Sequence, residues 1–174
     1  MPETEILLTV AEVAVAFAGF ASLVSILGRG TSADDPRVLS IRMRAMLLTS
    51  LLVVGFSLVP VLLGSYGASP RVAWVASSVS LLLATLAYYR WLQKGIVTLG
   101  RAGLTPSRLQ RRVIIPTLLA TLGVVSLLLV VNAQLAIPAI YLTALVLLLF
   151  QSGFAFSLIV FSFLPRIPDD LNGE

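Results

Sequence analysis

Residues 12–25 read Glu-Val-Ala-Val-Ala-Phe-Ala-Gly-Phe-Ala-Ser-Leu-Val-Ser and lie inside the first long apolar run, residues 6–28. Glu12 is the only carboxylate well inside any apolar run of the chain. The residues after it are rich in Ala, Gly and Ser, which let membrane helices approach one another closely. We therefore expect this segment to be a helix at the packed centre of a small membrane bundle.

The composition indicates a membrane protein. The chain has 174 residues, of which 58% are hydrophobic and 11% are charged, and its mean hydropathy is +1.01. Soluble domains carry roughly 25% charged residues, so the bilayer is the expected solvent, and residues 1–174 form one transmembrane domain. The acidic N-terminus lacks the basic region of a secretory signal, so we expect the first apolar run to remain as a span.

Several function classes are disfavoured by the residues that the chain lacks. It contains no Cys and no His, which removes thiolates, the usual near-neutral proton shuttle and the commonest metal ligand. No phosphate-binding loop motif occurs either. We expect no enzymatic activity, no metal and no cofactor. The net charge of +4 predicts basic cytoplasmic loops and no nucleic-acid partner.

Five apolar runs approach or exceed the ~20 residues that a spanning helix needs. They cover residues 6–28, 43–64, 70–92, 113–131 and 137–164. A capping residue followed by proline, which is typical of a helix start, predicts starts at Pro36, Pro70 and Pro106. The expected fold is an all-α integral membrane bundle of five transmembrane helices. Residues 132–134 should break the chain after the fourth span, and residues 151–153 should bend the fifth.

The orientation follows from the distribution of positive charge. In a five-span arrangement, Arg71 is the only one of the 12 Lys and Arg residues on the side of the N-terminus. The positive-inside rule then places the N-terminus outside and the C-terminus in the cytoplasm. The bacterial inner (cytoplasmic) membrane is the expected location.

The first span has two distinct stripes on a helical wheel. One stripe is a small-residue packing face, comprising Ala11, Ala14, Ala18, Ala21, Ser22 and Ser25. The other holds Glu5 and the pore or ion-binding candidates, which are Thr9, Glu12, Ala16, Gly19 and Leu23, with Phe20 at its edge. If copies of the chain met around it, Glu12 would form an acidic ring and Leu23 or Phe20 an apolar constriction, both of which cation channels use. Alternatively, Glu12 is hydrogen-bonded inside one bundle and fixes packing.

Polar residues in the other spans could satisfy a buried Glu12. By depth, the polar-layer candidates are Ser57, Ser78, Ser126, Thr143 and Gln151. Hydroxyls in helices also bond their own backbone, which is the simpler alternative. Gln151 is expected to bond across helices. Arg108, Arg111 and Arg112 share one helix face and are candidates for binding anionic lipid head groups.

The chain resembles a family of uncharacterised small bacterial multi-pass membrane proteins. The resemblance is carried by residues 15–21, Val-Ala-Phe-Ala-Gly-Phe-Ala, which match an AFAGF-type first span, and by Ser57-Leu58-Val59-Pro60 in the second span. An Asn near the end of the fourth span and a Tyr in the fifth also fit. The resemblance implies the multi-pass architecture and carries no activity.

Two hypotheses about function remain. The first is a small homo-oligomeric channel that conducts a cation or protons through an acidic ring from the first helix. The second is a non-catalytic membrane scaffold or regulator that binds anionic lipid or another membrane protein. A water-filled axis along the Glu12 stripe favours the first, and a dry seam there favours the second.

Overall fold

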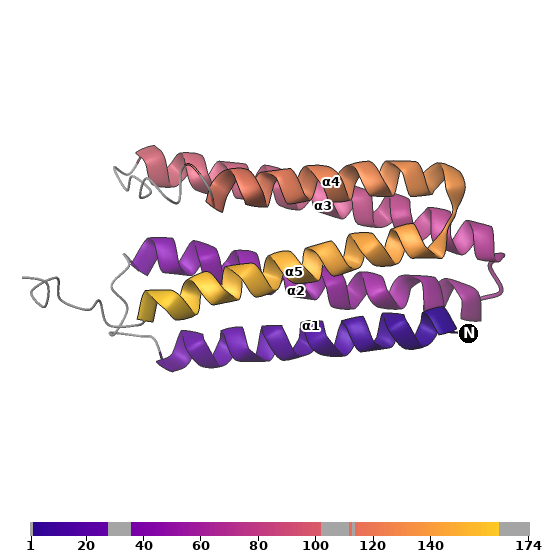
Figure 1. Cartoon of the computed structure of the whole chain (residues 1–174), viewed down its shortest axis with the longest axis horizontal. Coiled ribbons are helices and arrows are strands. Elements are labelled where there is room, and N and C mark those ends of the chain that lie inside the picture. Colours follow the sequence, from indigo (N-terminus) through magenta and orange to yellow (C-terminus); the bar gives the residue numbers. More distant parts are fainter. Residues whose placement is uncertain (1, 28–35, 102–111, 113, 164–174) are drawn as a thin grey trace, which may run out of the picture.

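The computed structural model describes residues 2–27, 36–101, 112 and 114–163, and its elements are helices. In chain order they are α1 (Pro2–Leu27), α2 (Pro36–Ser65), α3 (Pro70–Arg101), α4 (Ile115–Leu135) and α5 (Pro138–Phe163). Successive helices run in opposite directions along one long axis (Figure 1). The all-α prediction is confirmed.

Four of the described helices are long and apolar enough to cross a membrane. The candidate spans are Ser40–Ser65, Pro70–Thr98, Ile115–Leu135 and Pro138–Val160. By length and composition they indicate a membrane protein. α1 is not among the four, and it carries three carboxylates, Glu3, Glu5 and Glu12.

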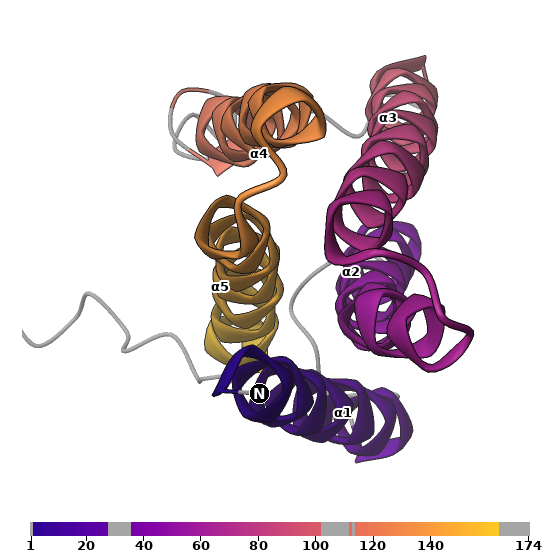
Figure 2. The same ribbon diagram turned by 90° about the vertical axis from the view of Figure 1, so that its right-hand side faces the viewer.

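The helices α2, α3, α4 and α5 form a ring in which each packs against the next and α5 closes back onto α2. α1 lies across the seam between α2 and α5 (Figure 2). Within the described residues it contacts neither α3 nor α4. The expectation that the first helix is the centre of the bundle is therefore wrong, because its small-residue face packs on only two neighbours at the edge.

The predicted helix starts at Pro36 and Pro70 are confirmed. The turn between α2 and α3 is closed by Gly67, whose φ of 83° lies in the left-handed region that glycine adopts without strain. The predicted end of the third helix near Leu92 is wrong, since α3 continues to Arg101. The apolar run ends near Leu92, but a helix can continue beyond the apolar part of its sequence. The predicted start at Pro106 lies outside the described residues.

The α4–α5 connection is tighter than the sequence indicated. The polar residues 132–134 are the last turn of α4, where a break was predicted. Ala136 adopts a left-handed conformation (φ 56°), and its amide donates to the Asn132 carbonyl at 2.8 Å. The Asn132 side-chain Oδ1 accepts the Ile137 amide, also at 2.8 Å. This side chain therefore closes the turn, and α5 begins at Pro138. α5 is one helix through residues 151–153, and the bend expected there stays a prediction.

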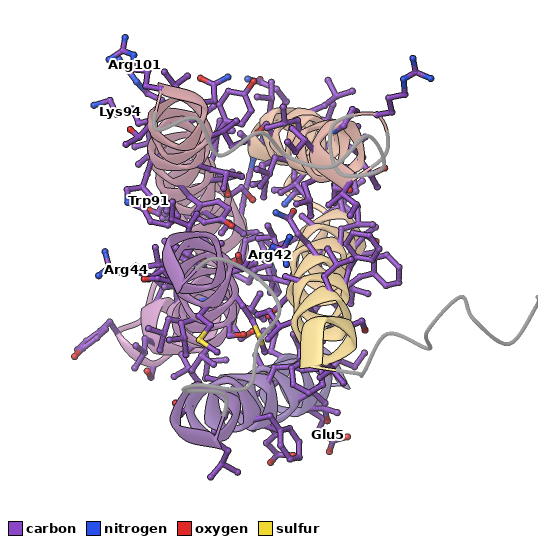
Figure 3. The ribbon with its side chains drawn as sticks, turned by 90° about the vertical axis from the view of Figure 1, so that its left-hand side faces the viewer. Glu5, Arg42, Arg44, Trp91, Lys94 and Arg101 are labelled. Atoms are coloured by element: carbon purple, nitrogen blue, oxygen red, sulfur yellow. The ribbon has the colours of Figure 1, made fainter. Side chains whose placement is uncertain are left out.

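Basic side chains gather at the end of the bundle where α2 begins and α3 ends. Figure 3 views this end and labels Arg42, Arg44, Lys94 and Arg101 there. Arg44, Lys94 and Arg101 are exposed. The Arg42 side chain differs, because it is half-buried and lies between α2 and α5. Arg71, at the start of α3, lies at the opposite end.

Candidate functional site

The Glu12 stripe lies on the outer surface of the single chain. Its members are all exposed: Glu5, Thr9, Glu12, Ala16, Gly19, Phe20 and Leu23. Phe20 and Leu23 expose 54% and 55% of their surface, and a Cβ added at Gly19 would meet nothing within 4 Å. The Thr9 hydroxyl donates to the Glu5 carbonyl within the helix. The stripe is therefore continuous along α1 and is uncovered in one copy.

The opposite face of α1 holds the helix on the bundle. Leu7, Val10, Ala11 and Ala14 are buried, and Ala18 is half-buried. Ser22, predicted for this face, is exposed and donates to the Ala18 carbonyl. The side chains of Ala21 and Ser25 lie outside the described residues. The predicted packing face thus holds over its first half.

α1 and α5 approach each other closely at Gly153. A Cβ at this position would lie 3.2 Å from the Phe17 ring, which is tighter than ordinary van der Waals contact. The Phe17 and Phe156 rings pack beside it with centroids 6.2 Å apart. The absence of a side chain at Gly153 therefore allows α1 to pack closely against α5, as small residues allow membrane helices to approach one another.

The polar-layer candidates do not surround Glu12. Ser57, Ser78 and Gln151 are buried within the ring of α2 to α5, whereas Glu12 is exposed on α1. Ser126 and Thr143 bond the carbonyls of Leu122 and Ala139 in their own helices. No hydrogen bond or ion pair joins Glu12 to another residue in the part of the chain that the structure describes. The expected satisfaction of Glu12 by this layer does not occur within one chain.

Some polar residues instead link the helices of the ring to one another. Asn132 Nδ2 donates to Ser78 Oγ at 2.8 Å, joining α4 to α3. The Tyr141 hydroxyl donates to the Phe56 carbonyl at 2.6 Å, joining α5 to α2. The hydroxyls of Ser50 and Ser152 bond at 2.7 Å across the α2–α5 contact. A buried hydrogen bond of this kind contributes roughly 1 kcal/mol between membrane helices.

A further polar group lies where α2, α3 and α5 meet. The Tyr88 side chain of α3 interacts with the side chains of Thr49 on α2 and Gln151 on α5. Tyr88 is only 7% exposed. Its hydroxyl reaches the Ala45 carbonyl of α2 at 3.4 Å. Gln151 thus lies near Tyr88 of a neighbouring helix, and its expected hydrogen bond across helices stays a prediction. Tyr88 had no periodic signal that could identify it.

The lipid head-group candidates are only partly visible. Arg112 is exposed, and Arg108 and Arg111 lie outside the described residues. Among the described side chains no cluster of three or more His, Cys, Asp or Glu residues could hold a metal ion. The site that the structure presents is thus the Glu12 stripe on α1, with a separate polar interior in the ring.

Comparison with known proteins adds no relative: no protein-family model, no curated protein and no solved structure matches the chain.

Proposed function

We propose that α1 crosses the membrane together with α2, α3, α4 and α5, so that the protein has five spans. The N-terminus is then outside and the C-terminus is in the cytoplasm. α1 is 26 residues long, or about 39 Å at 1.5 Å per residue, and runs beside α2 and α5 along the bundle (Figure 1). The basic end of the bundle would then face the cytoplasm, in keeping with the positive-inside rule. We place the protein in the bacterial inner (cytoplasmic) membrane.

The exposed Glu12 stripe carries the proposal of a homo-oligomer. Glu12 would lie ~10 Å along the helix from the outer edge of the apolar run, where an ionisable group facing lipid is costly. A second copy of the same chain is a suitable cover, because copies arranged around an axis present the same stripe to one another. Small residues at Ala16 and Gly19 would let those copies approach closely.

Copies meeting along this stripe would line a cation path. Glu5 and Thr9 would stand at its outer mouth, followed by a ring of Glu12 carboxylates. The apolar side chains of Phe20 and Leu23 would form a constriction beyond the ring, with Leu23 ~16 Å along the helix from Glu12. Acidic rings select cations, and apolar constrictions gate by excluding water. We therefore propose that the oligomer conducts a cation or protons.

A second candidate is a non-catalytic scaffold or regulator that binds anionic lipid or another membrane protein. It is favoured by the exposed basic side chains at one end of the bundle, Arg44, Arg90, Lys94, Arg101 and Arg112. Each well-placed basic residue contributes ~1 kcal/mol of attraction to an anionic membrane surface. This candidate requires assembly through α1 without conduction.

The conduction proposal is tested by a single cysteine placed at Ala16. The chain has no native cysteine, so a thiol reagent modifies only this position. In Ala16→Cys protein reconstituted in liposomes, a positively charged thiosulfonate reagent should lower cation flux, since it places a cation beside the Glu12 ring. Leu127→Cys is the matched control, as Leu127 is exposed on α4, away from α1. Equal flux before and after complete modification of Ala16→Cys would remove α1 from the path.

A further inference from the structure

Two buried hydroxyls in the ring of α2 to α5 differ from the others in these helices. Most serine and threonine hydroxyls here donate to the carbonyl four residues earlier, a common arrangement in membrane helices. The residues with this bond are Thr9, Ser22, Thr49, Ser65, Ser77, Ser78, Thr98, Thr121, Ser126, Thr143 and Ser157. Ser57 and Thr85 are fully buried, and their hydroxyl oxygens have no partner among the described residues.

Gln151 adds a third unpartnered atom from another helix. Its side chain is 4% exposed, and Oε1 has no hydrogen-bond partner in the described part of the chain. The three atoms therefore come from α2, α3 and α5. A buried polar atom without a partner costs about 1–3 kcal/mol, and buried polar groups in proteins are almost always satisfied by protein or by ordered water.

The three residues lie on the inward faces of their helices. Thr85 belongs to the buried stripe of α3 and is one turn, ~4.5 Å, from Tyr88. Tyr88 in turn interacts with Thr49 and Gln151. On α2, Ser57 continues the buried row of Thr49 and Val53 at i+4 spacing. Polar groups are thus distributed along the interior of the ring, among apolar neighbours.

The chemistry of this interior favours a neutral guest. Residues 36–163 contain no Asp or Glu, so the interior offers hydroxyl and amide groups and no anion. At the basic end of the bundle the Arg42 side chain lies between α2 and α5 (Figure 3). Water meets these conditions, because it can donate to Gln151 Oε1 and both donate to and accept from the two hydroxyls.

We propose that ordered water occupies the interior of the ring beside Ser57, Thr85 and Gln151. At the end of the bundle opposite Arg42 the interior is closed by the Asn132–Ser78 hydrogen bond and by Tyr141, which is fully buried and packs edge-on against Trp74 with ring centroids 5.7 Å apart. These hydrated positions are distinct from the α1 stripe, and they depend on neither conduction nor assembly.

The test uses single cysteines in the native cysteine-free chain, reconstituted in liposomes. A thiol reacts as the thiolate, whose fraction is small in apolar surroundings because they raise the pKa of the thiol. Thr85→Cys should therefore react with methyl methanethiosulfonate at least about tenfold faster than Leu83→Cys. Leu83 is two residues away at similar depth and is 63% exposed on the outer surface of α3. Adding Gln151→Leu should slow the reaction of Thr85→Cys by removing a water partner.

Equal and slow reaction of Thr85→Cys and Leu83→Cys in folded protein would overturn the proposal. If Thr85→Cys does not fold, Ser57→Cys decides the question in the same assay: fast reaction supports a hydrated interior, and reaction as slow as that of Leu83→Cys overturns it. Folding is verified for each variant by its elution and thermal midpoint in detergent. None of these readouts involves ion flux, so the result is separate from that of the conduction proposal.

Discussion

Glu12→Gln is expected to lower cation flux through the reconstituted protein by about tenfold or more. A carboxylate ~4 Å from a cation contributes ~1 kcal/mol even at the dielectric constant of water, and several copies would act together in a ring. A loss of ~1.4 kcal/mol corresponds to a factor of ten in occupancy. The measurement is the initial rate of cation uptake by liposomes, at equal amounts of reconstituted protein.

Glu3→Gln is the matched control for this substitution. Glu3 lies nine residues before Glu12, which places it on the opposite side of the helix at 100° per residue, and it is half-buried. Its replacement changes the net charge equally but should leave the flux near the wild-type rate. Wild-type flux in Glu12→Gln, or an equal loss in both variants, would contradict a Glu12 ring.

Gly153→Leu is expected to displace α1 from α5. A Cβ alone would lie 3.2 Å from the Phe17 ring, and a leucine side chain must push further into that contact. Overpacking of this kind costs typically ~1–3 kcal/mol. The expected result is a lower denaturant midpoint in detergent titrations. Because the stripe is carried by α1, the flux should fall as well.

The control for Gly153→Leu is Gly123→Leu on α4. A Cβ at Gly123 meets nothing within 4 Å. The same increase in side-chain volume should therefore leave the free energy of unfolding within about 0.5 kcal/mol of wild type, as is usual for surface changes. If the two variants shift the denaturant midpoint equally, the Phe17–Gly153 contact does not hold α1 against α5.

The helix starts were predictable because their signals are local. Asp35-Pro36 and Ser69-Pro70 combine a capping residue with a proline at the first helical position, and α2 and α3 begin at those prolines. The end of α3 was not predictable in the same way. The residues after Leu92 are compatible with helix, and no proline or paired glycine interrupts them before Gly100.

The place of α1 could not be obtained from its composition. Small residues indicate close packing, but they do not say how many neighbours a helix has. The two stripes of the wheel were partly predicted, since Ala11 and Ala14 are buried and Glu12 is exposed. The polar interior was missed in part because the rotation of each helix decides which hydroxyls meet. Ser57 and Thr85 point into the ring only once α2, α3 and α5 are packed together.

The most direct measurement is cation flux into liposomes that contain the wild-type protein. The proposed conduction through the α1 stripe predicts uptake above that of protein-free liposomes. Assembly is checked in the same sample by disulfide cross-linking of Gly19→Cys protein, which should join copies across the stripe. Absence of flux at every pH, with the cross-linked oligomer present, would contradict conduction and leave the scaffold as the function of the assembly.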